Sequence, residues 1–265
     1  MTLPVAGQRY VALGSSMAAG PGITPRAPGS PRAAMRSARN YPHLLAADLS
    51  LDLVDVSYSG ATTANVLTDA QHGTPPQVEA LDGTEALITV TVGGNDIAYV
   101  PGLFVATLPG IVRALPVVGG RMREALDPAA REEALLQVAD SLREVGTTLR
   151  KRSPQARVLF VEYLTLLPPP GEPAPPLKPA HADLARHLAS RLVEITAEAA
   201  AETGCEVVPV ADASRDHHAW SDDPWTTGAT LPLPGRPLPY HPTASGMRAV
   251  ATMLRDHLAQ ENAER

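Results

Sequence analysis

Five short apolar segments alternate with helical patterns along this chain of 265 residues, and the alternation limits the folds open to it. The segments are Arg9–Leu13, Leu51–Ser57, Ala86–Val92, Arg157–Glu162 and Glu206–Val210. Most of them are apolar at successive positions, as expected of strands that helices cover on both faces. Strands that alternate with helices predict an α/β protein with a mostly parallel sheet and right-handed crossovers.

The segments between the strands predict helices. These are Tyr41–Leu49, Thr63–Asp69, Pro128–Ser153, Pro179–Thr203 and Thr243–Gln260. Asn40 is a favoured N-cap for the first, and Gly204 is a favoured C-cap for the fourth. The third repeats apolar residues at helical spacing, and its expected buried side consists of Leu135, Leu136, Val138, Ala139, Leu142, Val145 and Leu149. The alternation continues without an internal repeat, so we expect a single domain over residues 1–265.

Composition narrows the classes of function. The chain has 22 Lys and Arg against 28 Asp and Glu, a net charge of −6, so we expect no nucleic-acid partner. The single cysteine, Cys205, excludes an internal disulfide, and the N-terminus lacks the pattern of a signal peptide. We expect a cytoplasmic protein, with export of a longer precursor as the alternative. No segment has metal-ligand, phosphate-loop or dinucleotide spacing, so no metal or cofactor is expected. The oligomeric state is open.

Three of the expected strands end in turns of small or polar residues. Ser16 follows the first in Gly-Ser-Ser-Met-Ala-Ala-Gly, Gly60 follows the second in Ser-Gly-Ala-Thr-Thr, and Asn95 follows the third in Gly-Gly-Asn-Asp. Ligand sites of open α/β sheets lie beyond the carboxyl ends of the strands. We therefore expect these turns to share one site.

Side chains in these turns have the chemistry that acyl transfer to a serine needs. A serine hydroxyl becomes a nucleophile when a base takes its proton, and His241, in Tyr-His-Pro-Thr-Ala-Ser-Gly, is a candidate base. An asparagine amide and turn N–H groups can donate hydrogen bonds to a developing oxyanion. Taken singly, Ser16 also reads as a helix cap, Asn95 as a turn former and His241 as an ordinary surface histidine. His217 and His218 form a rival pair.

Together the four segments resemble the SGNH hydrolases, the GDSL-type lipases and esterases. The stretch Ser-Asp-Asp-Pro-Trp, from Ser221 to Trp225, is also similar to their actinobacterial members. The resemblance implies a flavodoxin-like three-layer α/β/α sandwich around a five-stranded sheet, with hydrolysis through an acyl-enzyme. By this resemblance Ser16 is the nucleophile and His241 is the base. The backbone amides of Ser16 and Gly60 and the side chain of Asn95 form the oxyanion hole.

Two positions depart from the family pattern. Ser15 stands where the family usually has an aspartate before the nucleophile, and Leu238 stands where it usually has an acid, three residues before the histidine. A main-chain carbonyl can accept the Nδ1–H of a histidine and set its tautomer. We therefore expect a serine–histidine dyad oriented by the carbonyl of Leu238. An aspartate from elsewhere, Asp222 or Asp223, is the competing possibility.

The first functional hypothesis is a serine-dependent carboxyl-ester hydrolase, an esterase or lipase acting on a small-molecule or lipid ester. A carbohydrate O-deacetylase, a phospholipase and a thioesterase use the same catalytic parts. A catalytically silent binding module is the alternative of another class, because Ser15 and Leu238 depart from the pattern.

The segment Val100–Asp127 is rich in Leu, Val and Pro. It is either a wall or lid over the acyl group or an ordinary core helix, and its prolines argue against a membrane span. If it is a wall, short to medium acyl esters are favoured, because an apolar lining selects apolar groups.

Overall fold

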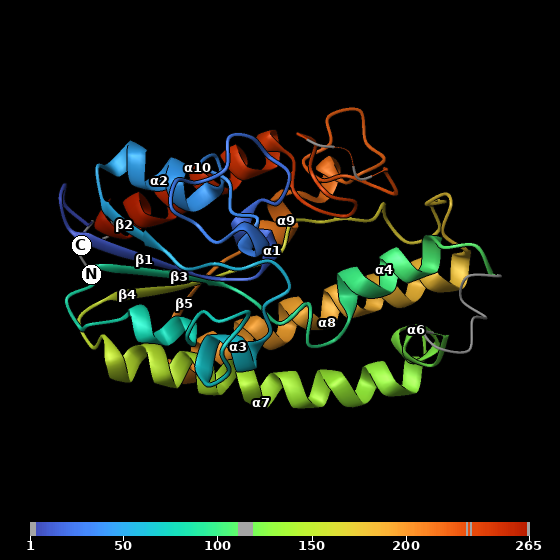
Figure 1. Cartoon of the computed structure of the whole chain (residues 1–265), viewed down its shortest axis with the longest axis horizontal. Helices are drawn as coiled ribbons and strands as arrows, with labels where there is room; N and C mark the ends of the chain where they lie inside the picture. The colour runs from blue at the N-terminus through green and yellow to red at the C-terminus, as the bar shows by residue number, and fades with distance from the viewer. Residues whose placement is uncertain (1–3, 111–118, 232, 234, 264–265) are drawn as a thin grey trace.

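Five parallel strands form one sheet in the order β2-β1-β3-β4-β5 (Figure 1). The computed structural model describes residues 4–110, 119–231, 233 and 235–263. The strands are β1 (Arg9–Gly14), β2 (Asp52–Asp55), β3 (Leu87–Thr91), β4 (Arg157–Val161) and β5 (Glu206–Val208). The predicted α/β sheet is therefore confirmed, with strand ends that differ from the expected ones by a few residues.

Helices cover both faces of this sheet. The helices are α1 (Ser16–Ala19), α2 (Tyr41–Leu49), α3 (Thr63–Leu67), α4 (Tyr99–Thr107), α6 (Gly119–Ala125), α7 (Pro128–Arg152), α8 (Pro179–Thr203), α9 (Val210–Ala213) and α10 (Ala244–Ala263), with short 3₁₀ turns η1 (Arg32–Ala34), η2 (Gln77–Ala80) and η3 (Arg215–His217). In Figure 1, α2 and α10 lie above the sheet, and α3, α7 and α8 lie below it. The result is the three-layer sandwich that the resemblance implied.

The two faces of the sheet belong to two hydrophobic clusters. In β1, Val11 and Leu13 pack toward α7 and α8, whereas Tyr10 and Ala12 pack toward α2 and α10. Successive side chains of a strand point to opposite faces, so a strand buried on both sides must be apolar throughout. This explains why the strand segments read as continuous apolar runs.

Local signals in the sequence predicted the ends of several helices. The Asn40 Oδ1 atom accepts a hydrogen bond from the backbone N–H of His43 at 3.1 Å, so Asn40 caps α2. Gly204 ends α8 in the left-handed conformation, with φ +67°. On α7 the buried side is confirmed except at Leu136, which is 69% exposed. It directly follows buried Leu135, and successive residues of a helix point about 100° apart.

The segment Val100–Asp127 falls partly outside the described residues, which omit 111–118. Its first part lies in α4, which packs against α8 and buries Leu103 at 1% exposure. That burial is typical of a core helix. Among the described residues, no helix is both long and apolar enough to span a bilayer.

Strand order explains why the three predicted turns meet. β1 lies between β2 and β3, and all three strands run in the same direction. The turn that carries Ser16 therefore lies between the turn that carries Gly60 and the turn that carries Asn95, at the carboxyl edge of the sheet.

Candidate active site

Ser16 is the first residue of α1, two residues after β1 ends. Its side chain faces His241, and its Oγ atom lies 2.8 Å from the Nε2 atom of that ring. Both residues are almost fully buried, at 6% and 7% exposure. The fold thus joins two residues that are 225 positions apart in the sequence.

The other ring nitrogen of His241 contacts a main-chain carbonyl. The Nδ1 atom lies 2.7 Å from the carbonyl oxygen of Pro239. The carbonyl of Leu238, which the sequence analysis assigned to this position, instead accepts a hydrogen bond from Thr227 Oγ1 at 2.6 Å. The carbonyl beside Nδ1 is therefore that of Pro239, and the expectation for Leu238 is corrected.

The course of the chain before His241 explains this one-residue difference. Tyr240 has φ +60°, a left-handed conformation in which the chain turns sharply. The turn brings the carbonyl two residues before the histidine back toward its ring. Thr227 holds the turned segment, because its N–H donates to the carbonyl of His241 at 2.9 Å and its Oγ1 accepts from the N–H of His241 at 3.1 Å.

Burial governs the charge of the imidazole. Desolvation lowers the pKa of His241 to about 4, and the hydrogen bond to the carbonyl of Pro239 opposes this only in part. The ring hydrogen bonds are to Ser16 and Pro239, with no carboxylate partner among the described residues. His241 is therefore neutral at neutral pH, with the Nδ1–H donated to the carbonyl and Nε2 left to accept from the serine.

The competing acids and histidines lie elsewhere. Asp222 and Asp223 are exposed, and the carboxylate of Asp223 lies 3.3 Å from the Nδ1 atom of His217. The ring of His217 stacks on Trp225 at a centroid distance of 3.7 Å. The backbone N–H of Trp220 donates to the Nδ1 atom of His218 at 3.2 Å. None of these groups has a hydrogen bond to Ser16 or His241 among the described residues.

Asn95 and Gly60 lie on the two sides of the serine turn. The Asn95 Nδ2 atom donates one hydrogen bond to the carbonyl of Ala61 at 2.8 Å, which leaves its second N–H available. Gly60 has φ +80°, a conformation that an L-residue adopts only with strain. Among the described residues, the backbone N–H groups of Ser16 and Gly60 donate no hydrogen bond. Three donors are thus available around the serine turn.

Asp96 ties the asparagine turn to the glycine turn. Its Oδ1 atom accepts hydrogen bonds from the N–H of Thr63 at 3.0 Å and from the Oγ1 of Thr63 at 2.6 Å. Desolvation by burial raises the pKa of this carboxyl group, and the bonds from Thr63 oppose the rise. Asp96 therefore supports the position of α3 and of the turn before it.

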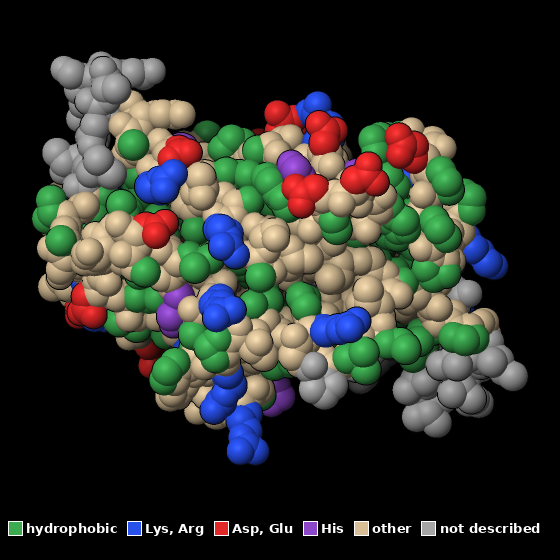
Figure 2. All heavy atoms as spheres, turned by 90° about the horizontal axis from the view of Figure 1, so that it is seen from above, with side chains coloured by type: hydrophobic (Ala, Val, Ile, Leu, Met, Phe, Trp, Pro, Cys, Tyr) green, Lys and Arg blue, Asp and Glu red, His purple; other side chains and the backbone are tan. Residues whose placement is uncertain are grey.

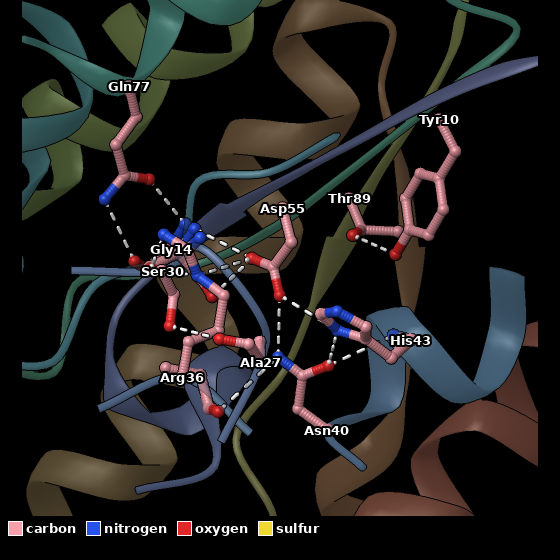
Figure 3. Close-up of polar contacts among 12 residues, drawn as sticks. Tyr10, Gly14, Ala27, Ser30, Arg36, Asn40, His43, Asp55, Gln77 and Thr89 are labelled. Carbon is pink, nitrogen blue, oxygen red and sulfur yellow. Dashed lines mark hydrogen bonds and ion pairs between the residues drawn. The ribbon is translucent and has the colours of Figure 1, made fainter. Parts of the chain in front are cut away.

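Sequence reasoning missed the residues that brace the end of β1. Gln77 clamps Gly14 through both of its backbone groups: the N–H of Gly14 donates to Oε1 at 2.7 Å, and Nε2 donates to the carbonyl at 3.0 Å (Figure 3). A Cβ atom on Gly14 would lie 2.4 Å from the carbonyl oxygen of Thr91, so only glycine fits. Gln77 is 63 residues away in the sequence, and no local pattern indicated it.

A second brace joins the segment after Ser16 to the end of β2. Buried Asp55 accepts a hydrogen bond from Asn40 Nδ2 at 2.7 Å (Figure 3). It also accepts one from the N–H of Ser57 at 2.9 Å. The guanidinium of Arg36 donates to the carbonyl of Ser57, and Asn40 also reaches the carbonyl of Ala19 at 3.4 Å. The asparagine that caps α2 therefore also holds the end of α1.

Other reactive groups on the chain lie apart from this site. Burial raises the pKa of the partly buried Cys205 thiol, which weakens it as a nucleophile. Among the described residues, no cluster of three or more His, Cys, Asp or Glu side chains can hold a metal ion.

Figure 2 shows charges of both signs spread between hydrophobic side chains on the face above α2 and α10, with acidic groups gathered along one edge.

A parallel α/β sheet with a buried serine–histidine pair and available amide donors at its carboxyl edge defines a class of hydrolytic enzyme. Within that class, a family model for the GDSL-like lipases and acylhydrolases matches residues 12–249. The chain belongs to this family of carboxylic ester hydrolases. The resemblance inferred from the sequence is thereby confirmed.

Individual relatives agree with this assignment. Lipase 2 of Streptomyces coelicolor is 31% identical in an alignment of 257 residues that covers 94% of this chain and 85% of that protein. The crystal structure of an extracellular lipase from Streptomyces rimosus has a TM-score of 0.78 at 25% identity, over 94% of this chain and 99% of that one. Phospholipase A1 from Streptomyces albidoflavus has a TM-score of 0.73 at 24% identity, over 95% and 99% of the two chains, and shares the fold.

Proposed function

We propose that this protein hydrolyses carboxylic esters through a Ser16–His241 dyad whose histidine is oriented by the carbonyl of Pro239. The observation that carries the proposal is the 2.8 Å contact between Ser16 Oγ and His241 Nε2, with the opposite ring nitrogen held at 2.7 Å by a carbonyl. This geometry leaves Nε2 unprotonated and pointed at the serine proton.

The reaction proceeds in two halves. Ser16 Oγ attacks the ester carbonyl carbon while His241 Nε2 takes the hydroxyl proton, and the imidazolium then returns that proton to the departing alcohol. The acyl group is left as an ester of Ser16. A water molecule gives a proton to His241 and attacks the acyl carbon. The acid leaves, and Ser16 recovers its proton.

The oxyanion formed in each half is stabilised by the donors around the serine turn. These are the backbone N–H groups of Ser16 and Gly60 and the second N–H of Asn95. Loss of one such donor costs about 2.7–4 kcal/mol of transition-state stabilisation in a well-studied protease. The carbonyl of Pro239 offers a dipole rather than a full charge, so the imidazolium depends more on the oxyanion beside it.

An apolar pocket that Tyr163 connects to the serine turn supports esters with an apolar acyl group. It has a volume of about 410 Å³, within the range of small-molecule sites. Its apolar lining includes Val92, Leu164, Leu166, Leu167, Leu192 and Val193. Ser16 does not line it, but Tyr163 does, and the hydroxyl of Tyr163 lies 3.1 Å from Ser15 Oγ. Tyr163 thus connects the pocket wall to the residue before the nucleophile. Of the described residues in 100–127, none lines it.

Filling this pocket is expected to shift the substrate preference toward short acyl groups. Ala189 lies on α8 in the pocket wall and is partly exposed. Ala189→Trp should lower the ratio of kcat/KM for p-nitrophenyl octanoate to that for the acetate by about tenfold or more, because each lost methylene contact is worth about 1–3 kcal/mol. Ala201→Trp, at an exposed position of the same helix, is the matched control. An unchanged ratio in Ala189→Trp would exclude acyl binding there.

The pH dependence of kcat/KM follows from the lowered pKa of His241. The base must be neutral in the free enzyme, and at pH 5 a histidine with a pKa of about 4 is about 90% neutral, against about 3% for one at 6.5. We expect kcat/KM to stay near its plateau down to about pH 5. Rates measured with short pulses at each pH, followed by recovery at pH 7.5, separate titration from unfolding. An acid limb centred near 6.5 would contradict the buried, carboxylate-free histidine.

Chemical labelling tests the assignment of the nucleophile. A p-nitrophenyl phosphonate should modify the protein once, and peptide mapping should find the label on Ser16. Hydrolysis of p-nitrophenyl acetate and butyrate should be lost together with labelling in Ser16→Ala. Labelling at another serine, or equal hydrolysis by Ser16→Ala and wild type, would refute the proposal.

Location stays a prediction. The sequence predicts a cytoplasmic protein, whereas the solved Streptomyces rimosus relative is named as an extracellular lipase. Fractionation of the native organism with an antibody against this chain distinguishes the two.

A further inference from the structure

Tyr163 stands between the two turns that the proposed reaction uses, yet the family pattern does not include it. It follows β4 and is 8% exposed. Its hydroxyl accepts a hydrogen bond from the backbone N–H of Gly94 at 3.0 Å and lies 3.1 Å from Ser15 Oγ, in a pair where either oxygen can donate. The hydroxyl oxygen of Tyr163 therefore contacts both the turn that carries Ser16 and the turn that carries Asn95.

The two partners of this hydroxyl are immediate neighbours of the proposed catalytic groups. Ser15 precedes the nucleophile Ser16, and Gly94 precedes Asn95. Ser15 is buried at 1% exposure and stands where the family usually has aspartate. Its N–H donates to the carbonyl of Thr91 at 2.8 Å, so its backbone is fixed to β3. The side chain of Ser15 caps α1 by accepting from the N–H of Met17 at 3.5 Å, and its Oγ also pairs with the hydroxyl of Tyr163.

Gly94 and Tyr163 fit each other closely. A Cβ atom at Gly94 would lie 2.4 Å from Tyr163 Cε2 and 2.8 Å from its hydroxyl oxygen. Only glycine lets the ring come near enough for its hydroxyl to reach the N–H. Burial raises the pKa of Tyr163 to about 12, so the hydroxyl keeps its proton over the working range of a hydrolase.

We propose that Tyr163 is a positioning residue for ester hydrolysis: its hydroxyl bridges Ser15 and Gly94 and thereby sets the spacing between the Ser16 nucleophile and the Asn95 amide. This inference rests on the proposed function. It gives Ser15, which stands where the family usually has aspartate, a hydrogen-bonding role with Tyr163. The oxyanion forms on a substrate bonded to Ser16 and is held by Asn95. An error in spacing therefore weakens the transition state more than the bound substrate.

Removing the hydroxyl alone tests this role. Tyr163→Phe keeps the ring that packs beside Gly94, and we expect kcat to fall by about 5- to 20-fold with KM within about twofold, as a lost hydrogen bond and a small misplacement predict. Ser15→Ala removes the same bond from its other end, together with the 3.5 Å cap to the N–H of Met17, and should give a similar or somewhat larger fall. The double variant should be no slower than about twice the slower single one, because groups that act as a unit are not additive.

Tyr10→Phe is the matched control. Tyr10 is fully buried, and its hydroxyl pairs with Thr89 Oγ1 at 2.7 Å near the start of β1, away from the serine turn (Figure 3). It should lower Tm about as much as Tyr163→Phe does while leaving kcat unchanged. The rate constant for Ser16 modification by the phosphonate gives a second readout that needs no ester substrate, and it should fall in Tyr163→Phe and not in Tyr10→Phe.

The outcomes separate this inference from the proposed function. If Ser16→Ala is inactive but Tyr163→Phe keeps kcat and the labelling rate within about twofold, the hydrolase stands and the positioning role is overturned. Independent, multiplying losses in Tyr163→Phe and Ser15→Ala would also overturn it. If Ser16→Ala remains active and wild-type Ser16 is not labelled, the proposed function fails and this inference fails with it.

Discussion

Ser16→Ala is expected to lower kcat for p-nitrophenyl butyrate by about 10⁴-fold or more, because loss of the nucleophile in a comparable hydrolase costs about 10⁶-fold. The variant removes the only atom that forms the acyl-enzyme. It leaves the amide donors and the apolar pocket in place, so KM and the binding of butyrate should change little.

Stability should survive this change. Among the described residues, Ser16 Oγ makes one hydrogen bond, to His241, and the cap of α1 belongs to Ser15. Ser141→Ala is the matched control, because Ser141 is partly exposed on α7 and, within the part of the chain that the structure describes, its Oγ bonds only the carbonyl of Gln137, at 3.0 Å. It should retain full activity. A Ser16→Ala protein that still shows a burst of p-nitrophenol would place the nucleophile elsewhere.

His241→Ala is expected to lower kcat by about 10²- to 10⁴-fold, the contribution of a positioned acid–base group, and to slow phosphonate labelling of Ser16 in parallel. Without the imidazole, nothing within hydrogen-bonding reach of Ser16 Oγ among the described residues can take its proton. Addition of Ser16→Ala to this variant should cause little further loss, because the two side chains act as a unit.

The aspartates that compete for the orienting role supply the controls. Asp222→Asn and Asp223→Asn should each leave kcat within about twofold of wild type, since both are exposed and Asp223 contacts His217. A collapse of kcat in either variant would show that a carboxylate reaches His241 during the reaction. The orienting group would then not be the carbonyl of Pro239.

Removal of His241 should also change how stability depends on pH. Its pKa falls from 6.5 to about 4 on folding, so the unfolded chain binds a proton that the folded protein rejects. The free energy of unfolding of the wild-type protein is therefore unaffected by this titration above about pH 6.5. It decreases by about 3 kcal/mol as the pH falls from about 6.5 to about 4. The difference in Tm between His241→Ala and wild type should therefore narrow or reverse over that interval.

The sequence alone determined the architecture and the set of candidate catalytic residues. Strands follow from short continuous apolar runs and helices from apolar patterns of period 3.6, and caps such as Asn40 and Gly204 act within a few residues. Such local signals are complete in the sequence. The residue types in the Ser16, Gly60, Asn95 and His241 segments were then enough to predict the family. Their order along the chain and the strand-end positions of the first three could also be inferred from the sequence.

Only the tertiary structure decided how those residues are held. The carbonyl beside His241 is that of Pro239 and not that of Leu238, because the left-handed conformation of Tyr240 turns the chain. No sequence pattern predicted that turn. Gln77 and Tyr163 reach the serine turn from 63 and 148 residues away. Such contacts depend on strand register and on the course of loops, which are set by the packing of the whole sheet and not by neighbours in the chain.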